Sequence, residues 1–194
     1  MTSLFDNYEI ILASGSPRRH QFFNDLKIPF KVDIRKIHEV YPKHLQGHYI
    51  TDYLAELKSQ VFNDLKENQI LITSDTIVWH NGIALGKPGS HREAKDMIQS
   101  LSGSSHKVIT SVCFKTYSAK KIINYTTEVT FKKLTESEID FYVDNYHPLD
   151  KAGAYGIQEW IGLIGITNIN GSYFNVVGLP THLVYETLMT MVKP

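Results

Sequence analysis

An Asn-Gly pair between two apolar segments most constrains the fold of this 194-residue chain. Residues 69–79 (QILITSDTIVW) are strongly apolar, Asn81-Gly82 follows them, and residues 83–85 are apolar again. Such a pair favours the tight turn of a β-hairpin, whose two strands run antiparallel. Because strand and helix patterns alternate elsewhere in the chain, we predict a mixed central β-sheet flanked by helices and not an all-parallel sheet.

Hydrophobic periodicity and capping residues predict the other elements. We expect strands at residues 8–13, 30–35, 106–114 and 121–131, and strand, Asn170-Gly171 turn and strand within residues 160–178. Helices are expected at residues 17–26, 49–65, about 91–101, 135–146 and 181–191. The helix at 49–65 should present one apolar face, made of Tyr53, Leu54, Leu57, Val61 and Leu65. Two capping boxes are predicted, from Ser90 with Glu93 and from Thr135 with Glu138.

Composition narrows the class of protein. Lys plus Arg and Asp plus Glu both number 20, so the formal net charge is zero, which argues against a protein that binds long duplex nucleic acid. No apolar run reaches membrane-spanning length, and the N-terminus does not have the pattern of a signal peptide. The single Cys113 cannot form an intramolecular disulfide. We therefore expect one domain over residues 1–194, soluble and cytoplasmic, with no membrane partner.

The segment LASGSPRR joins the end of a predicted strand to the start of a helix. Free backbone N–H groups and the helix dipole attract anions to such a position. The hydroxyls of Ser14 and Ser16 add hydrogen-bond donors, and the guanidinium groups of Arg18 and Arg19 suit phosphate oxygens. The alternative is a capped helix whose arginines lie in solvent. The segment alone does not decide between the two.

Asp75 lies in the middle of an apolar strand, where an unpaired carboxylate is costly. We therefore interpret it as a functional residue with a cationic partner or a metal ion, against the alternative of a strand end. Lys87, in the sequence GKP, could reach the same site or lie in solvent. Glu39 could complete a cation site with Asp75. Lys58 lies on a predicted helix, where a solvated face is the ordinary expectation.

The segment KAGAYGIQ contains two glycines that indicate a bend or a close backbone approach. Gln158 could bind a base edge through its amide, and Lys151 could meet a phosphate. A plain glycine-rich connection is the alternative. The histidines and Cys113 show no zinc-binding spacing.

Taken together, these segments resemble the Maf family of nucleoside triphosphate pyrophosphatases. LASGSPRR, SDT followed by GKP, LSGSSHKVITSV, KAGAYGIQ and INGSYFNVVGLP occur in the family's order and span nearly the whole chain. The resemblance implies the mixed α/β fold of the inosine triphosphate pyrophosphatases, with two lobes around a cleft and often a homodimer. It also implies cleavage of a nucleoside triphosphate to the monophosphate and pyrophosphate with a divalent metal.

The resemblance also implies roles for individual residues. Asp75 is implied as the proton acceptor, and Arg19, Thr76 and Gln158 mark the branch that accepts dTTP and UTP. Two departures occur: Ser74 replaces an alanine common in the family, and Glu159 and Trp160 follow Gln158 where glycine is common. An acid and a bulky residue beside Gln158 could alter the base pocket.

We accordingly expect a pyrophosphatase that acts on dTTP and UTP, with modified pyrimidine triphosphates as further candidate substrates. Four residues are assigned to the phosphates: Ser14, Ser16, Arg18 and Arg19. Lys58 and Lys87 would neutralise the leaving pyrophosphate, and Glu39 and Asp75 would hold Mg²⁺ or Mn²⁺. The alternatives are a non-catalytic nucleotide-binding regulator of cell division and a 7-methyl-GTP pyrophosphatase.

Overall fold

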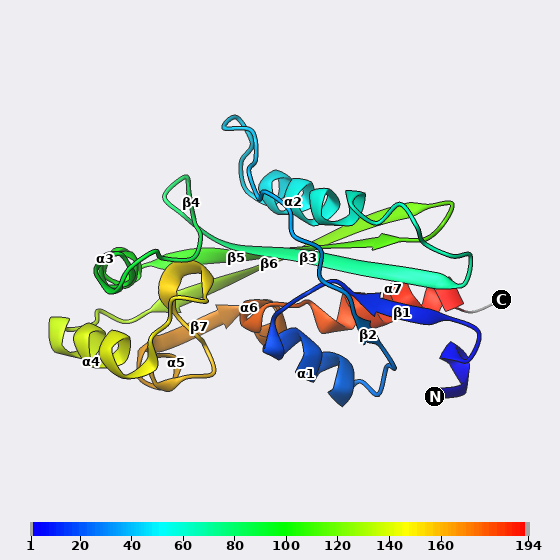
Figure 1. Cartoon of the computed structure of the whole chain (residues 1–194). Coiled ribbons are helices and arrows are strands. Elements are labelled where there is room, and N and C mark those ends of the chain that lie inside the picture. The colour runs from blue at the N-terminus through cyan, green and yellow to red at the C-terminus, as the bar shows by residue number, and fades with distance from the viewer. Residues whose placement is uncertain (1, 193–194) are drawn as a thin grey trace. The chain divides into compact units, whose positions relative to one another are not determined.

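A computed structural model describes residues 2–192 (Figure 1). The chain forms two compact units. Unit 1 comprises the residues up to Asp75, the segment Thr110–Tyr125 and the residues from Gly178 onward. Unit 2 comprises Thr76–Ile109 and Thr126–Val177. The two units agree with the two lobes expected from the family resemblance, while the cleft stays a prediction.

A seven-stranded sheet is the central element. Its strands are β1 (Glu9–Leu12), β2 (Lys31–Val32), β3 (Gln69–His80), β4 (Ile83–Leu85), β5 (Ser105–Lys115), β6 (Lys120–Phe131) and β7 (Ile166–Asn170). The order is β2-β1-β3-β5-β6-β7, and β4 pairs with β3. β1 runs parallel to β2 and β3, whereas β4 and β7 run antiparallel to β3 and β6. The predicted mixed sheet and the hairpin at Asn81-Gly82 are confirmed.

Helices occupy most of the remaining described chain. They are α1 (Pro17–Asp25), α2 (His48–Gln60), α3 (His91–Leu101), α4 (Glu136–Tyr146), α5 (Trp160–Gly165), α6 (Tyr173–Val177) and α7 (Thr181–Val192), with short 3-10 helices η1 (Thr2–Phe5) and η2 (Ala152–Ala154). Within residues 2–192, none of these helices has the length and apolar character needed to cross a bilayer.

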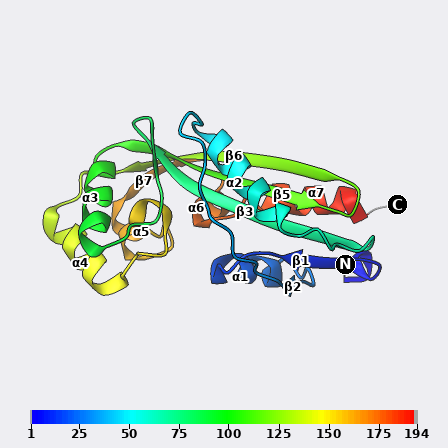
Figure 2. The ribbon, with the colours of Figure 1, turned by 45° about the horizontal axis from the view of Figure 1, so that its top comes forward.

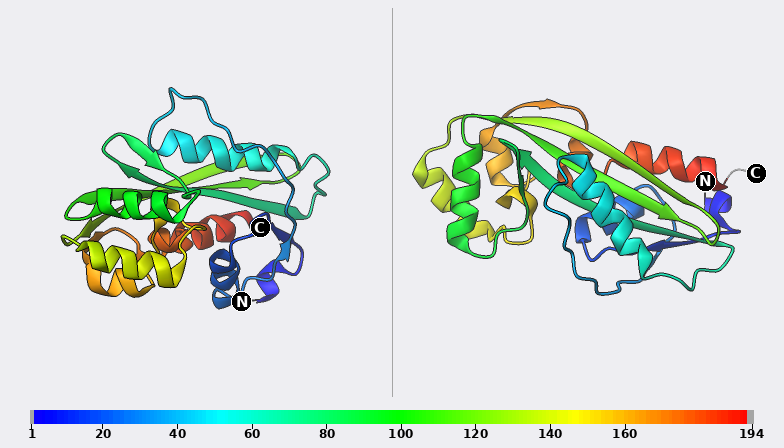
Figure 3. Two further views of the ribbon diagram at one scale, coloured as in Figure 1. Left: turned by 60° about the vertical axis from the view of Figure 1, so that its left-hand side comes forward. Right: turned by 90° about the horizontal axis from the view of Figure 1, so that it is seen from above.

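In unit 1 the period-2 alternation of the strands divides the core into two layers. Ile10 and Leu12 of β1 pack with residues of α1 and α7, whereas Ile11 and Leu71 pack with Phe62, which follows α2. The views agree with this division, because α2 covers one face of the sheet and α1 and α7 cover the other (Figures 1 and 3). Successive side chains of a strand point to opposite faces, so one strand serves both layers.

Unit 2 is built on helices α3, α4 and α5, which lie beside one another (Figure 2). Their buried residues form a single apolar cluster with strand residues of the same unit. The helical members of this cluster are Ala94, Ile98, Leu101, Ile139, Tyr142, Val143 and Ile161. Tyr142 is fully buried although its side chain ends in a hydroxyl, so this group must find hydrogen-bond partners inside the unit.

One of the two predicted capping boxes is complete. At α4 the Thr135 side chain accepts from the Glu138 backbone, and the Glu138 carboxylate accepts from the Thr135 N–H. At α3 the Ser90 hydroxyl accepts from the Glu93 N–H as expected. The Glu93 carboxylate, however, accepts from the N–H of Gly89 at 2.7 Å, one residue earlier than the box requires.

The helix predicted at 49–65 is shorter than expected, and of the predicted apolar face Leu54 and Leu65 are buried. α2 ends at Gln60, and the Lys115 ammonium binds the carbonyls of Ser59 and Phe62 just where the chain leaves the helix. Tyr53 and Val61 are each 37% exposed. The buried face instead comprises Ile50, Thr51, Leu54, Ala55 and Ser59. The strand predicted at 30–35 is reduced to β2, whose two residues are exposed at the sheet edge.

The segment 160–178 differs most from the prediction. It forms α5, β7 and α6, where we expected two strands around the Asn170-Gly171 turn. A short apolar run does not distinguish a strand from a buried helix. The Ser172 hydroxyl accepts from the Asn175 N–H and so caps α6. This serine was the local signal for a helix.

His106 lies in the core of unit 2 and is 3% exposed. Its Nε2 and the Tyr155 hydroxyl are 2.7 Å apart, and its ring stacks on Phe131. Burial, with a smaller contribution from His80, lowers the pKa of His106 to about 4. Below pH 6.5 the unfolded chain therefore takes up a proton that the folded protein accepts only near pH 4.

We predict that stability falls as the pH drops from 7 to 4.5, with His106 contributing on the order of 2–3 kcal/mol. Urea unfolding of the wild-type and His106→Gln proteins at both pH values measures this, because glutamine does not titrate. The matched control is His44→Gln, since His44 is exposed. An equal pH dependence in wild type and His106→Gln would contradict the prediction.

Candidate active site

The predicted site residues divide between the two units. Unit 1 contains Ser14, Ser16, Arg18, Arg19, Glu39, Lys58 and Asp75. Unit 2 contains Thr76, Lys87 and Gln158. The boundary falls between Asp75 and Thr76, which are consecutive residues of β3. Each group is described within its own unit.

The loop before α1 is ordered by its own hydroxyl groups. Ser16 is the N-cap of α1, and its side chain accepts from the Arg19 N–H at 3.5 Å. The Ser14 hydroxyl accepts from the Ser16 N–H at 3.3 Å, and a ring nitrogen of His20 contacts the Ser14 carbonyl. Pro17 occupies the first turn, where a missing N–H costs no hydrogen bond. The predicted strand–turn–helix element is confirmed.

Arg19 is held by oxygen atoms from three segments of unit 1. Its Nε donates to the Gly178 carbonyl at 2.9 Å, and its Nη1 donates to the Ser74 carbonyl at 3.2 Å and to the Ser14 hydroxyl at 3.4 Å. Burial lowers the pKa of Arg19 to about 10, and the nearby Asp75 opposes that shift. Arg19 therefore remains a cation at neutral pH and is fixed beside the strand that carries Asp75.

Lys58 joins the two predicted carboxylates. Its Nζ lies 2.7 Å from Asp75 Oδ1 and 3.1 Å from Glu39 Oε2. It also donates to the Ser74 carbonyl at 3.4 Å. Its side chain is only 18% exposed, so the solvated face expected for Lys58 is wrong. Asp75 has the cationic partner that its position in an apolar strand requires.

The same arrangement tests whether unit 1 can hold a divalent metal. Three oxygen atoms, from Asp75, Glu39 and the Ser74 carbonyl, converge on the Lys58 ammonium. Oxygen donors of this kind suit Mg²⁺ and Mn²⁺. Within residues 2–192 there is no cluster of three or more His, Cys, Asp or Glu side chains able to hold a metal ion. Two carboxylates and one carbonyl are fewer than the six ligands that Mg²⁺ takes, so an ion bound by these residues would need substrate oxygens and water to complete its coordination.

In unit 2 two of the predicted loops are tied together. The Gly153 N–H donates to the Gly86 carbonyl at 3.0 Å, so the loop of Gln158 adjoins the turn that carries Lys87. Gly153 has a φ of +67°, and a Cβ there would meet the Val78 side chain at 2.7 Å. Glycine is thus required for this approach. Lys87 and Gln158 are both exposed.

Three residues near Gln158 have contacts that the sequence did not reveal. Lys151 is buried and pairs with Asp150 at 2.7 Å and Glu159 at 3.1 Å, so the phosphate contact considered for it is not supported. The Tyr142 hydroxyl donates to Glu159 and accepts from the Gly156 N–H. The Trp160 ring packs on Phe141. The acid and the bulky residue after Gln158 therefore both have partners of their own.

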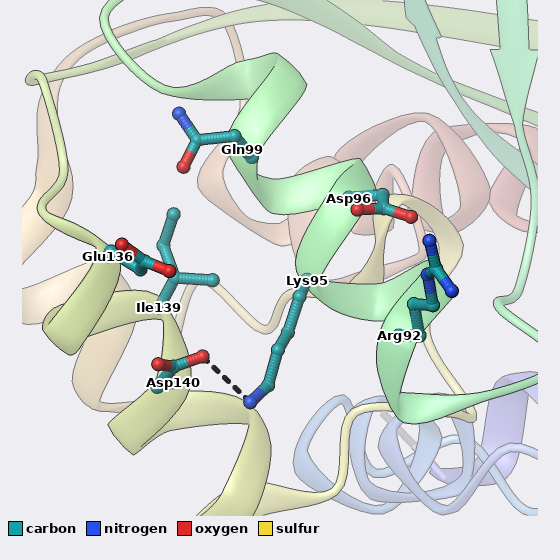
Figure 4. Close-up of a pocket in the computed structure, with 7 residues that line it drawn as sticks. All are labelled: Arg92, Lys95, Asp96, Gln99, Glu136, Ile139 and Asp140. Carbon is teal, nitrogen blue, oxygen red and sulfur yellow. Dashed lines mark ion pairs between the residues drawn. The ribbon is translucent and has the colours of Figure 1, made fainter.

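A surface pocket between α3 and α4 contains none of the predicted site residues (Figure 4). Its lining comprises Arg92, Lys95, Asp96, Gln99, Glu136, Ile139 and Asp140. Lys95 pairs with Asp140 at 2.7 Å across it. Acids in this lining offset the cations, so the pocket lacks the positive character that a triphosphate requires.

The Lys58–Asp75 pair generates a thermodynamic prediction. The Lys58 and Asp75 side chains are only 18% and 12% exposed. We therefore expect a coupling free energy of about 1–3 kcal/mol in a double-mutant cycle of Lys58→Met and Asp75→Asn. The matched control is Lys95→Met with Asp140→Asn, whose side chains are more accessible, at 33% and 46%, and should couple by less than about 1 kcal/mol. Urea unfolding of the wild type, the four single variants and the two double variants measures both values. Equal coupling in the two cycles would contradict the prediction.

Comparisons with known proteins identify the family of this chain. The family model described as Maf-like protein matches residues 9–191. The chain is 62% identical over 194 residues to a protein of Christiangramia forsetii named dTTP/UTP pyrophosphatase, covering 100% of this chain and 99% of that protein. A protein of the same name from Bacteroides fragilis is 46% identical over 190 residues, covering 97% and 98%.

Among solved structures, a HAM1 protein from Coxiella burnetii has a TM-score of 0.52 at 14% identity, with 94% of this chain and 99% of that chain covered. At this identity the similarity concerns the fold alone, and it agrees with the α/β class predicted from the sequence. The family model and the curated relatives both span nearly the whole chain. The chain therefore belongs to the family of Maf-like proteins.

Proposed function

We propose that this protein hydrolyses dTTP and UTP to the nucleoside monophosphate and pyrophosphate. The observation that carries the proposal is the contact of Lys58 with both Asp75 and Glu39, in a chain whose relatives are named dTTP/UTP pyrophosphatase. A binding protein without turnover would not need a carboxylate kept in an apolar strand at this cost. The geometry thus favours chemistry over the alternative of a nucleotide-binding regulator.

Binding of the triphosphate is assigned to the loop before α1 and to the lysines. The hydroxyls of Ser14 and Ser16, the Arg18 side chain and the positive end of the α1 dipole would bind phosphate oxygens. Arg19 would contribute its charge from the fixed position described above. Lys58 and Lys87 would neutralise the departing pyrophosphate, where negative charge accumulates in the transition state.

Asp75 is assigned as the proton acceptor for the attacking water. Glu39 and Asp75 would hold Mg²⁺ or Mn²⁺, which supplies positive charge to the phosphate oxygens when bound. Lys58 holds both carboxylates in one place and so keeps these groups oriented for the reaction.

Recognition of the pyrimidine base is assigned to Gln158 and Thr76, with Arg19 as the third residue of the specificity set. The Gln158 amide offers both donor and acceptor groups, which matches the edge of a thymine or uracil. Modified pyrimidine triphosphates share that edge and would also be substrates. A 7-methyl-GTP pyrophosphatase would require a different set at these three positions.

The setting of the reaction is proposed on the same basis. We infer a single-domain cytoplasmic enzyme over residues 1–194 that works as a homodimer and has no nucleic-acid partner. The buried free Cys113 is consistent with a reducing compartment.

We predict that Asp75→Asn retains the fold and loses roughly a hundredfold or more in turnover of dTTP, because the amide cannot accept the proton. Steady-state kinetics measure the loss, and thermal unfolding verifies the fold. Asp140→Asn is the matched control, since it removes an aspartate from an ion pair in unit 2. Full activity in a folded Asp75→Asn protein would rule out this mechanism.

The bond that breaks gives a second prediction for this function. In ¹⁸O-labelled water, attack at the α-phosphorus should place the label in dTMP and leave pyrophosphate unlabelled. Mass spectrometry of the products measures this. A γ-phosphatase would instead release labelled orthophosphate and dTDP, and that result would refute the proposed reaction.

A further inference from the structure

Gln158 occupies a tight turn whose two ends are held by one phenol. The Glu159 N–H donates to the Gly156 carbonyl at 3.0 Å, so Ile157 and Gln158 are the two central residues of a four-residue turn. The Tyr142 hydroxyl accepts from the Gly156 N–H at 3.0 Å and donates to the Glu159 carboxylate. A single hydroxyl from α4 therefore bridges the first and last residues of the turn.

The carboxylate of Glu159 is fixed as closely as the turn itself. A Cβ at position 156 would lie 2.7 Å from Glu159 Cδ, so the side chain packs directly on the bare backbone of Gly156. Its other oxygen pairs with Lys151 Nζ at 3.1 Å, and these side chains are only 20% and 10% exposed. Charge-assisted bonds between poorly hydrated groups are stronger than surface ion pairs.

The phenol is suited to its two bonds. Burial, and the carboxylate of Glu159, raise the pKa of Tyr142 far above its usual range. The hydroxyl therefore keeps its proton and can donate to Glu159 at every pH at which the protein would work. A donor and an acceptor role are both satisfied, as a fully buried tyrosine requires.

Gln158 itself is exposed, while Ile157 before it is 6% exposed. The residue after it, Glu159, is also the N-cap of α5, and its carbonyl accepts from the N–H groups of Gly162 and Leu163. The backbone before and after Gln158 is thus held by hydrogen bonds. The amide side chain is presented to solvent from a rigid frame.

We propose that Lys151, Glu159 and Tyr142 are positioning residues that hold the turn of Gln158 and thereby set the selectivity for the base. The inference rests on the proposed function, because it takes Gln158 as the residue that binds the pyrimidine. The three residues touch neither the phosphates nor the reacting atoms. They act by fixing where the amide of Gln158 lies, so their loss should weaken base discrimination and leave the chemical step nearly intact.

The test compares Glu159→Gln and Tyr142→Phe with the wild type. Glutamine removes the charge that Lys151 binds but keeps the shape, and phenylalanine removes the hydroxyl that bridges the turn. We expect KM for dTTP to rise about tenfold while kcat changes less than about twofold. The ratio of kcat/KM for dTTP to that for dGTP should fall about tenfold. Calorimetric Kd values for dTMP and dGMP should converge by the same factor, independently of turnover.

Matched controls are Tyr146→Phe, which removes an exposed phenol from the same helix, and Asp140→Asn, which breaks an ion pair elsewhere in unit 2. Neither should change the ratio. If Tyr142→Phe fails to fold, Glu159→Gln and the calorimetric comparison still decide the matter. A wild type without pyrimidine preference would overturn the proposed function and this inference together. A wild type that discriminates, with variants that discriminate equally well, would overturn only the inference.

Discussion

The Asp75 carboxylate within β3 places the strongest physical demand on unit 1. Ser74 before it and most other residues of the strand are buried, so a charge at this position needs a cation within hydrogen-bond distance. Lys58 meets that need from α2. The Thr73 hydroxyl donates to the Ala55 carbonyl at 2.6 Å, which fixes the same helix on the same strand. The packing of α2 on β3 therefore also brings the Lys58 ammonium to the Asp75 carboxylate. Glu39 binds the same ammonium.

Unit 2 also buries polar groups, but it does so through close approaches of the backbone. Its glycines allow backbone and side chains to approach closely, as where Gly153 packs on Val78 and Gly156 on Glu159. The polar groups brought inside by these approaches then bind one another. Unit 1 thus offers charged side chains drawn from separate segments, whereas unit 2 offers a turn whose main chain is held in place. The proposed charge neutralisation and the proposed recognition of the base would call for these two kinds of construction.

Local patterns predicted the elements whose signals are local. The Asn81-Gly82 hairpin, the strand containing Asp75 and the Thr135 capping box depend on neighbouring residues and were predicted correctly. The nature of α5 and α6 depends on packing within the unit, so an apolar run could not reveal it. For Lys58 the sequence provided a helix without showing which face the sheet covers. Lys58 was assigned to the leaving pyrophosphate, but the Asp75 carboxylate that draws it out of solvent lies 17 residues away along the chain.

The contacts of Glu159 also depend on packing and not on the local sequence. In the sequence this residue appears as a negative charge beside Gln158, the residue proposed to bind the base, where the family resemblance leads one to expect glycine. In the structure its charge is offset by Lys151, and its side chain fills the space above Gly156. Each of these residues fits only in the presence of the others, because removing one partner leaves a poorly hydrated charge or an open space. A glycine at position 159 would therefore demand a different neighbour for Lys151, and the turn of Gln158 would be held by other contacts.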